Sequence, residues 1–586
     1  MLSVRDLSVT FADPRGGPPV AAVRGLSFDL GRGEVLGLVG ESGSGKSATG
    51  LAVLGLHDPR NTTVTGSIRL GGEELVGADE SVLRGVRGGR VALVFQDALT
   101  SLSPFHGVGA QLAEMYRLHH PAAGRTEARR RAAAMLDRVG IPAARTRDYP
   151  HRFSGGMRQR VMIAMALMND PEVLIADEPT TALDARVQQQ VLDLLGDLQR
   201  EHGTAVLLVS HDLGVVAGMT DRTLVLRGGV EVESAPTARL LASPQEPYTR
   251  ALVGAALTLD SVPGSPLPTV DDSSPSGRFA ARVVEQKVVE QRESGRWLVE
   301  VDDLAVHFPG RRHFPGGRAD AVKAVDGVGL RIAPGETVGL VGESGSGKST
   351  ASRVLAGLQQ PTGGRVSYDG RVLYDGPGSA RPDRALRRRL SREVQLVFQD
   401  PYASLNPRRT VAQTLDTPLR LHTALTAAER RERSAELLEQ VGLSGEHLDR
   451  HPHEFSGGQR QRIGIARALA PQPRLIIADE PVSALDVSVQ AQVLNLLMEL
   501  RERLGVAFLF VSHDLAVVRH FCDRVAVMHR GRLVESADRD RLFAAPHTDY
   551  TRELLAAAPG AGARTASGAA VAAAVDGVDG VDGAAG

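Results

Sequence analysis

The sequence predicts an α/β protein with two repeated domains in tandem, each built around a parallel β-sheet. One octapeptide, Gly-Glu-Ser-Gly-Ser-Gly-Lys-Ser, occurs twice, and each copy follows a short apolar run and precedes a helix-compatible run. Further short apolar runs end in polar or acidic residues at matching places in both halves. Short, wholly apolar runs are typical of strands buried on both faces of a parallel sheet.

The repeat defines the domain boundaries. From Lys46 to Lys348 the numbering advances by 302, and the acidic and histidine positions described below keep the same step. We therefore predict a first domain over 1–259 and a second over 297–558. Residues 260–296, rich in Pro, Ser and Gly and then in Glu, Gln and Arg, are predicted to be a linker. The Ala/Gly-rich residues 559–586 cannot form a core and are predicted to be a disordered tail.

Composition narrows the class of protein. The chain has 586 residues, 42% hydrophobic and 23% charged, and a formal net charge of −1, which gives no reason to expect a nucleic-acid partner. A single cysteine, Cys522, excludes an internal disulfide and a cysteine-rich metal site. No signal-peptide pattern and no apolar run of the roughly 18–20 residues that span a bilayer are found. We expect a soluble, cytoplasmic protein that reaches a membrane only through partners.

The two glycine-rich loops predict phosphate binding. Each fits G-x-x-x-x-G-K-[ST] between a strand and a helix, the context in which this motif is credible. Backbone N–H groups and the helix N-terminus would surround a phosphate chain, with Lys46 or Lys348 at the β- and γ-phosphates and Ser47 or Ser349 on Mg²⁺. The loop residues are Gly40, Glu41, Ser42, Gly43, Ser44, Gly45, Lys46 and Ser47, and Gly342, Glu343, Ser344, Gly345, Ser346, Gly347, Lys348 and Ser349.

Paired carboxylates follow one apolar run in each half, at Asp177-Glu178 and Asp479-Glu480. Ligands bind at the carboxyl ends of strands in parallel sheets, where packing gives no reason for two acids. The aspartates suit coordination of Mg²⁺, and the glutamates suit polarising a nucleophilic water.

Other apolar runs end in single polar residues. Gln96 and Gln399 could reach Mg²⁺ or the attacking water through their amide oxygens. His211 and His513 follow a strand at the same distance from the carboxylates in both halves, which favours a contact with the γ-phosphate over a purely structural role.

Two further features can be interpreted in two ways. Each half carries a Ser-Gly-Gly before a helical run, which is either a simple capped helix start or a second anion cradle. Phe11 and Phe308 end the first strand of each half and could stack on a nucleobase or pack in the core. The Ser-Gly-Gly residues are Ser154, Gly155 and Gly156, and Ser456, Gly457 and Gly458.

The order of these motifs resembles the nucleotide-binding domain of ATP-binding-cassette (ABC) proteins, twice over. The resemblance covers nearly all of the chain except the linker and tail. It implies two tandem P-loop NTPase domains, each with a RecA-like parallel-sheet core, a helical subdomain and a small antiparallel β subdomain. The Tyr-Thr-Arg elements at Tyr248 and Tyr550 resemble those of dipeptide, oligopeptide and nickel importer ATPases, so the chain looks like two such subunits fused. Many of these carry a cysteine-rich segment after that element, which is lacking here.

In that family two cassettes pair head to tail around ATP and Mg²⁺. The resemblance therefore implies that the loop, Gln96, Asp177, Glu178 and His211 meet the Ser-Gly-Gly at Ser456. The second site would join the other loop, Gln399, Asp479, Glu480 and His513 to the Ser-Gly-Gly at Ser154. The implied partners are two transmembrane permease subunits and a substrate-binding protein, with the chain peripheral on the cytoplasmic side of the cell membrane.

Three alternatives belong to other classes. A drug-export ATPase and a ribosome-associated tandem ABC translation factor share the cassettes but lack the Tyr-Thr-Arg ends. A DNA-repair cassette ATPase would need zinc-finger cysteines, which this sequence does not have. The transported substrate cannot be read from the cassettes, because membrane subunits and a binding protein choose it.

Overall fold

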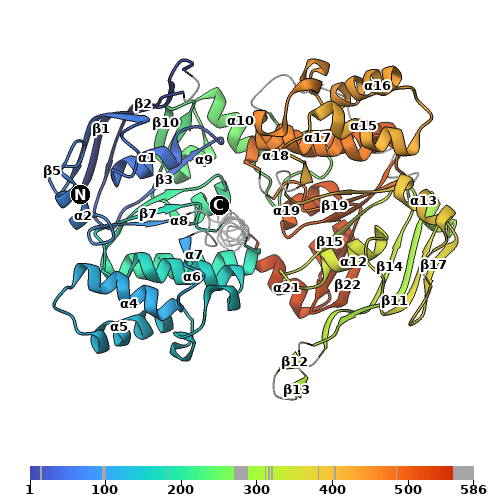
Figure 1. Cartoon of the computed structure of the whole chain (residues 1–586), viewed down its shortest axis with the longest axis horizontal. Helices are drawn as coiled ribbons and strands as arrows, with labels where there is room; N and C mark the ends of the chain where they lie inside the picture. The colour runs from blue at the N-terminus through green and yellow to red at the C-terminus, as the bar shows by residue number, and fades with distance from the viewer. Residues whose placement is uncertain are drawn as a thin grey trace, which may run out of the picture. The chain divides into compact units, whose positions relative to one another are not determined.

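We describe the fold from a computed structural model of the chain (Figure 1). The described residues are all except 14–15, 96–100, 181–182, 270–287, 311, 314–316, 319–320, 381, 401–403, 484 and 559–586. They group into two compact units, one built on Met1–Ala256 and the other on Leu257–Leu485 and the chain from Val489. Each unit is described by itself below.

The first unit contains two sheets. Its central sheet has the order β10-β9-β3-β8-β7-β6, in which only β10 runs antiparallel to its neighbour, and its second sheet, β2-β1-β4-β5, is antiparallel throughout. The strands are β1 (Leu2–Phe11), β2 (Val20–Leu30), β3 (Val35–Gly40), β4 (Thr62–Leu70), β5 (Glu73–Glu74), β6 (Val91–Val94), β7 (Val173–Asp177), β8 (Ala205–Val209), β9 (Arg222–Arg227) and β10 (Val230–Pro236).

Helices cover the central sheet. The helices that lie between β6 and β7 in the sequence form a separate helical part of the unit. The helices of the whole unit are α1 (Lys46–Val53), α2 (Glu80–Val86), α4 (Val108–His119), α5 (Arg125–Arg138), α6 (Gly155–Ala166), α7 (Ala185–His202), α8 (Leu213–Met219), α9 (Thr237–Ala242) and α10 (Pro247–Ala255), with 3₁₀ turns at Ala143–Arg145 and Pro150–Arg152. The predicted parallel core, helical part and small antiparallel part are all present.

The second unit repeats this arrangement. Its central sheet has the order β18-β19-β20-β15-β21-β22 and its antiparallel sheet the order β14-β11-β16-β17, with a separate two-stranded β12-β13 ladder. The strands are β11 (Val299–Phe308), β12 (Arg312–His313), β13 (Gly317–Arg318), β14 (Val322–Ile332), β15 (Thr337–Val341), β16 (Gly363–Tyr368), β17 (Arg371–Asp375), β18 (Val394–Val397), β19 (Leu475–Asp479), β20 (Ala507–Val511), β21 (Arg524–His529) and β22 (Arg532–Asp538). The helices are α12 (Lys348–Leu355), α13 (Arg384–Glu393), α15 (Val411–His422), α16 (Ala427–Gln440), α17 (Gly457–Leu469), α18 (Val487–Leu504), α19 (Leu515–Phe521), α20 (Arg539–Ala544) and α21 (Asp549–Ala556), with 3₁₀ turns at Gly445–Asp449 and Pro452–Glu454.

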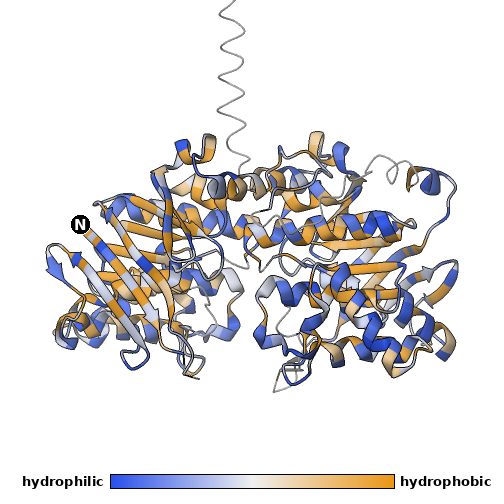
Figure 2. Ribbon diagram, turned by 90° about the horizontal axis from the view of Figure 1, so that it is seen from above, coloured by the Kyte–Doolittle hydropathy of each residue, from blue (hydrophilic) through white to orange (hydrophobic). Residues whose placement is uncertain are grey.

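The apolar runs form the strands that their composition predicts. All five residues of β8 and of β20 are buried, as are all six of β3 and all five of β15. Figure 2 shows the central strands as largely hydrophobic, whereas the helices that cover them mix hydrophobic and hydrophilic residues. Burial on both faces leaves only the strand ends for polar chemistry, and the predicted site residues lie at those ends.

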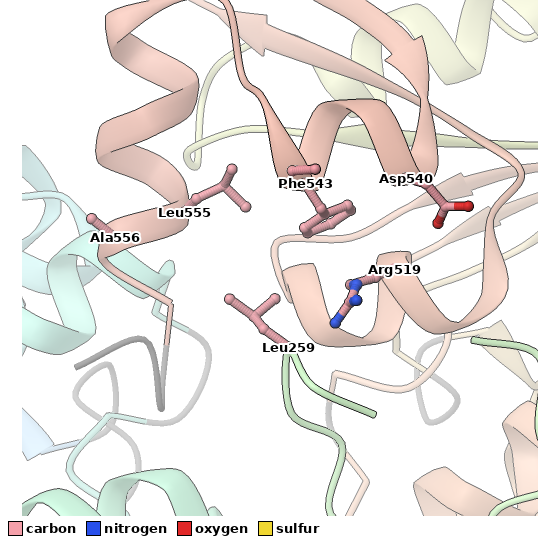
Figure 3. A pocket seen from close by; sticks show the side chains of 7 residues that line it. Leu259, Arg519, Asp540, Phe543, Leu555 and Ala556 are labelled. Atoms are coloured by element: carbon pink, nitrogen blue, oxygen red, sulfur yellow. The ribbon is translucent and has the colours of Figure 1, made fainter. Parts of the chain in front are cut away.

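The chain that follows α10 packs on the second unit. The backbone N–H of Leu267 donates to Asn495 of α18 and its carbonyl accepts from the same side chain, both at 2.9 Å. Leu259 lines a cavity of about 520 Å³ with Arg519, Phe543 and Leu555, which come from the C-terminal elements of that unit (Figure 3). The predicted boundary at 259 stays a prediction, and most of the linker lies outside the described residues.

None of the helices in the described part of the chain is both long and apolar enough to cross a membrane.

Candidate nucleotide-binding sites

The two predicted phosphate loops have the same backbone geometry. Each runs from the carboxyl end of a central strand (β3 or β15) to the start of a helix (α1 or α12). The last glycine before the lysine, Gly45 or Gly347, has a positive φ of 99° or 106°. A Cβ there would lie 2.4 Å from the Ala22 carbonyl oxygen in the first unit and 2.2 Å from that of Ala324 in the second. Only glycine fits, so each loop lies tight against a strand of the antiparallel sheet.

The loop lysine is buried and turned onto its own loop. Lys46 Nζ donates to the carbonyls of Gly40 and Glu41 at 2.7 and 2.9 Å, and Lys348 makes the same two bonds at the same distances. Burial lowers the pKa of Lys46, and nearby carboxylates act against that shift. An ammonium group with three donors held in this way can turn from the carbonyls to a phosphate without moving the backbone.

A hydroxyl and a carboxylate meet where Mg²⁺ was predicted. Ser349 Oγ donates to Asp479 Oδ1 at 3.2 Å, and Ser47 lies beside Asp177 at the equivalent place in the first unit. One buried oxygen of Asp177, Oδ1, has no hydrogen-bond partner among the described residues. Burial raises the pKa of both aspartates, partly offset by the serine bonds. An all-oxygen set with an unsatisfied buried acceptor suits a hard divalent cation, so these residues fit Mg²⁺.

The two glutamates have a special backbone conformation. Glu178 and Glu480 have φ of 48° and 49°, in the left-handed region that non-glycine residues rarely adopt. Their N–H groups donate to the carbonyls of Val209 and Val511 at 2.9 Å, which extends the pairing with the neighbouring strand by one residue. Strain of this kind persists where the surroundings fix it, and it aims each carboxylate past the end of its strand.

Each glutamate contacts the predicted histidine. His211 Nδ1 lies 3.0 Å from a carboxylate oxygen of Glu178, and His513 Nδ1 lies 3.2 Å from Glu480. Burial lowers the pKa of His211, but the bond and charge of Glu178 outweigh burial, so the net pKa is raised; His513 behaves alike. The aspartate after each histidine caps the next helix, and Asp212 accepts from Gly214 at 2.8 Å. The cap holds the turn that presents the histidine.

Gln399 joins this group in the second unit. Its Nε2 donates to the carboxylate of Glu480 at 2.6 Å, so the side chain lies beside the glutamate that is predicted to polarise the attacking water. The equivalent residue Gln96 lies outside the described residues.

The Ser-Gly-Gly segments are capped helix starts. Ser154 and Ser456 are the N-caps of α6 and α17, and each side chain accepts from the backbone N–H three residues on, at 3.3 Å. In the second unit Gln459 returns a bond to the Ser456 N–H, which completes a capping box. Met157 stands in that position in the first unit and cannot return the bond.

The second glycine of each segment is needed for packing. A Cβ at Gly156 would lie 2.2 Å from Val187 Cγ1, and one at Gly458 would lie 2.1 Å from Val489 Cγ1. The start of each helix therefore packs directly on the next long helix of the chain, α7 or α18. The role of these segments in binding phosphate stays a prediction.

The two phenylalanines proposed to stack on a base differ in their surroundings. Phe11 ends β1 and contacts the edge of the His57 ring, with centroids 5.5 Å apart. Phe308 ends β11 and is 43% exposed. Stacking on adenine stays a prediction for both.

One contact of the loops was not predicted. Tyr550, which the sequence marked only as part of the Tyr-Thr-Arg element, accepts a hydrogen bond from the backbone N–H of Glu343 at 3.3 Å. A signal existed, because Lys46 to Tyr248 and Lys348 to Tyr550 span the same number of residues in the two halves. Spacing of this kind cannot say which residues touch.

Comparison with known proteins agrees with this geometry. The family model described as ABC transporter matches residues 23–181 and 325–483. The model described as oligopeptide/dipeptide transporter, C-terminal region, matches residues 232–282 and 534–579, which include Tyr248 and Tyr550.

Curated relatives are similar along almost the whole chain. The chain is 46% identical to the glutathione import ATP-binding protein GsiA of Pectobacterium atrosepticum, over 95% of this chain and 89% of that protein. The protein of the same name from Escherichia coli K12 gives the same three values. A solved structure of the ATP-binding cassette MJ0796 bound to ADP and Pi is 30% identical over 41% of this chain and 98% of that chain, with a TM-score of 0.36. The chain therefore belongs to the family of ABC transporter ATP-binding proteins, which hydrolyse ATP, and it carries two cassettes, each followed by an oligopeptide/dipeptide-type C-terminal region.

Proposed function

We propose that this protein powers a bacterial importer of peptides or a similar small solute by hydrolysing ATP at two sites. The observation that carries the proposal is that both cassettes keep their nucleotide residues and both end in an oligopeptide/dipeptide-type region. The relatives named above are glutathione import proteins, which supports a peptide-like solute. An exporter or a ribosome-bound factor would leave the two C-terminal regions without explanation.

Each site would join residues of both cassettes. One would combine the loop of the first cassette, Asp177, Glu178 and His211 with the Ser-Gly-Gly at Ser456. The other would combine the equivalent residues of the second cassette with the Ser-Gly-Gly at Ser154. A single chain supplies both partners at high effective concentration, so closure around ATP does not depend on a second molecule.

The chain's own residues would bind the phosphates and orient the attacking water. Lys46 or Lys348 turns from the loop carbonyls to the phosphates, and the loop N–H groups and helix N-terminus hold their charge. The glutamate accepts a hydrogen bond from the attacking water, and His211, which lies 3.0 Å from Glu178, contacts the γ-phosphate. Because the carboxylate is fixed by its strained backbone, the water is oriented before reaction rather than during it.

Mg²⁺ would be held by Ser47 and Asp177 in one site and by Ser349 and Asp479 in the other, with Gln96 and Gln399 nearby. When bound, the ion neutralises charge on the β- and γ-phosphates. The buried, unsatisfied oxygen of Asp177 supports this assignment.

The partners would be two different permease subunits and a substrate-binding protein. The segments after Gln96 and Gln399 differ between the halves, Asp97-Ala98-Leu99-Thr100 against Asp400-Pro401-Tyr402-Ala403. Two different docking segments fit two different membrane subunits. The chain would then lie on the cytoplasmic side of the membrane, held there by the permeases.

The test is reconstitution with the permeases from the same gene neighbourhood in lipid vesicles. We expect ATP-dependent entry of a labelled peptide, stimulated ATPase activity with Mg²⁺, and loss of both in the Lys46→Ala, Lys348→Ala double variant. The unmodified and double variants should have equal thermal unfolding midpoints, which controls for misfolding. Transport in the opposite direction would favour an exporter, and recovery with ribosomes but never with membranes would contradict transport.

A further inference from the structure

We propose that residues 258–267 form a strap that positions His513 of the second ATP site, and that Asn495 is the positioning residue that fastens this strap. The segment follows α10 and belongs to the second unit, which begins at Leu257. The proposal rests on the role of His513 at an ATP site and adds a support from outside the cassette motifs.

The strap is hydrogen-bonded to two helices of its unit. Asn495 of α18 holds the backbone of Leu267 from both sides, because its Oδ1 accepts from the N–H and its Nδ2 donates to the carbonyl, both at 2.9 Å. The N–H of Gly264 donates to the backbone carbonyl of His520 in α19 at 3.0 Å. One segment therefore bridges α18 and α19.

Burial supports these hydrogen bonds. Leu259 and Leu267 of the strap are each 8% exposed, and the ring of His520 is 2% exposed. That ring lies beside the backbone of Val262 and Ser265. Two buried leucines contribute about 3–6 kcal/mol of transfer free energy, which offsets much of the entropy lost when the segment is ordered.

The helix that the strap holds begins at the turn of His513. Asp514 directly follows the histidine and caps α19 by accepting from the N–H of Ala516 at 2.9 Å. The helix has seven residues, and a helix of that length is marginal without tertiary support. Gly264 supplies such support at the far end, where a helix leaves its last carbonyls unsatisfied. Because seven residues span only about 10 Å, fixing that end also restricts the turn that presents His513.

The same end of α19 packs on the strand that leads to the histidine. Phe521, which directly follows His520, contacts Phe508 and Phe510 of β20 with ring centroids 5.4 and 5.0 Å away. β20 ends at Val511, two residues before His513. Strand, histidine turn and helix thus form a closed unit, and the strap binds it where the helix returns to the strand.

The first unit lacks the same anchors. The repeat step of 302 places Asp193 at the position of Asn495. A carboxylate cannot donate to a backbone carbonyl, and Asp193 accepts instead from Gln189 of its own helix at 2.7 Å. Gly218 stands at the position of His520, and a glycine inside a helix weakens it. We therefore expect a strap of this kind at the second site and not at the first.

The other described end of the predicted linker packs on the second unit as well. Val288 is 4% exposed, and Arg292 Nη1 lies 2.8 Å from a carboxylate oxygen of Asp538. Arg292 Nε lies 3.8 Å from Glu336, a fully buried carboxylate that directly precedes β15 and its phosphate loop. Both described ends of the linker are thus held by one cassette.

The experiment measures hydrogen–deuterium exchange of the full chain. Asn495→Asp gives the second cassette the residue of the first and removes the donor to the Leu267 carbonyl. The peptide covering 258–267 should exchange about five- to thirty-fold faster, as expected for the loss of one or two net hydrogen bonds. The amides of α19 should also exchange faster, because Gly264 no longer holds their end. Asp193→Asn is the matched control and should leave both segments unchanged.

A second variant acts from the strap itself. Leu267→Ser leaves every residue of α18 and α19 unchanged, so faster exchange in α19 can only come through the strap. In both variants the kcat for MgATP, with permease partners present, should fall about two- to five-fold, the factor that one net hydrogen bond supplies. The KM should change less than about two-fold, because the phosphate loop is untouched. A purely structural role would lower the unfolding midpoint without this separation of kcat from KM.

Two outcomes would overturn the proposal. Unchanged exchange of 258–267 in Asn495→Asp would show that Asn495 does not fasten the strap. Faster exchange of the strap with unchanged α19 exchange and unchanged kcat would show that the strap does not position His513. Absence of MgATP hydrolysis in the unmodified chain would instead contradict the proposed ATP sites, and the exchange data would then decide separately whether the strap is fastened.

Discussion

Replacing the water-polarising glutamate in either cassette should abolish nearly all steady-state ATP hydrolysis. The changes are Glu178→Gln and Glu480→Gln, made separately. The amide keeps the size of the side chain, and the backbone stays fixed through the N–H bonds to Val209 and Val511. Only the anionic oxygen that faces the histidine is lost, at 3.0 Å from His211 in the first unit.

The magnitude follows from the role of that oxygen. A positioned general base contributes about 10²- to 10⁴-fold, which corresponds to roughly 2.7–5.4 kcal/mol of barrier. If the two sites worked independently, one variant would keep about half of the turnover. If they share one closure step, as we expect from head-to-tail pairing, each variant should fall below about 1% of the unmodified rate.

The assay is phosphate release at saturating MgATP, with the permease partners present. Glu201→Gln serves as the matched control, because this glutamate is 61% exposed and pairs only with the half-buried Arg138 in the described structure. Both site variants should still bind ATP, since the loop lysines are intact. A variant of either site that turned over at close to the unmodified rate would show that this site is regulatory and would refute two equivalent catalytic sites.

Three other perturbations have definite outcomes. Gly458→Ala places a Cβ 2.1 Å from Val489 Cγ1 and should lower the thermal unfolding midpoint through about 1–3 kcal/mol of overpacking. Met157→Gln supplies the missing reciprocal bond to the backbone of Ser154 and should raise stability in urea by about 0.5–1 kcal/mol; no gain would mean that the capping box does not form there. Burial lowers the pKa of His520 to about 4, below the 6.5 of an unperturbed histidine, so the unfolded chain binds more protons between these values. Stability should therefore fall by up to about 3 kcal/mol as pH drops from 6.5 towards 4, and urea titrations of His520→Gln should show a smaller fall.

The local features of the sites were predictable from sequence because short-range geometry sets them. A glycine loop between a buried strand and a helix has one main solution, and the helices begin at Lys46 and Lys348 as the motif requires. The serine caps at Ser154 and Ser456 follow from the preference of serine for helix starts. The apolar run before the carboxylates of the first half forms β7, whose last residue is Asp177. The internal repeat made the motif assignments secure, because the same motifs recur at the same spacing in both halves and a single coincidental match would not.

What only the tertiary structure decided is which of these residues touch. The sheet order β18-β19-β20 places three strand ends side by side, so Glu480 can meet both His513 and Gln399 in the second unit. Sequence spacing fixes neither strand order nor the left-handed backbone of Glu480. The bond from Glu343 to Tyr550 joins residues 207 positions apart and depends on how α21 is anchored to β22. Such contacts are set by the packing of whole elements, and no local propensity encodes them, because burial of an element's apolar face constrains its partner only loosely.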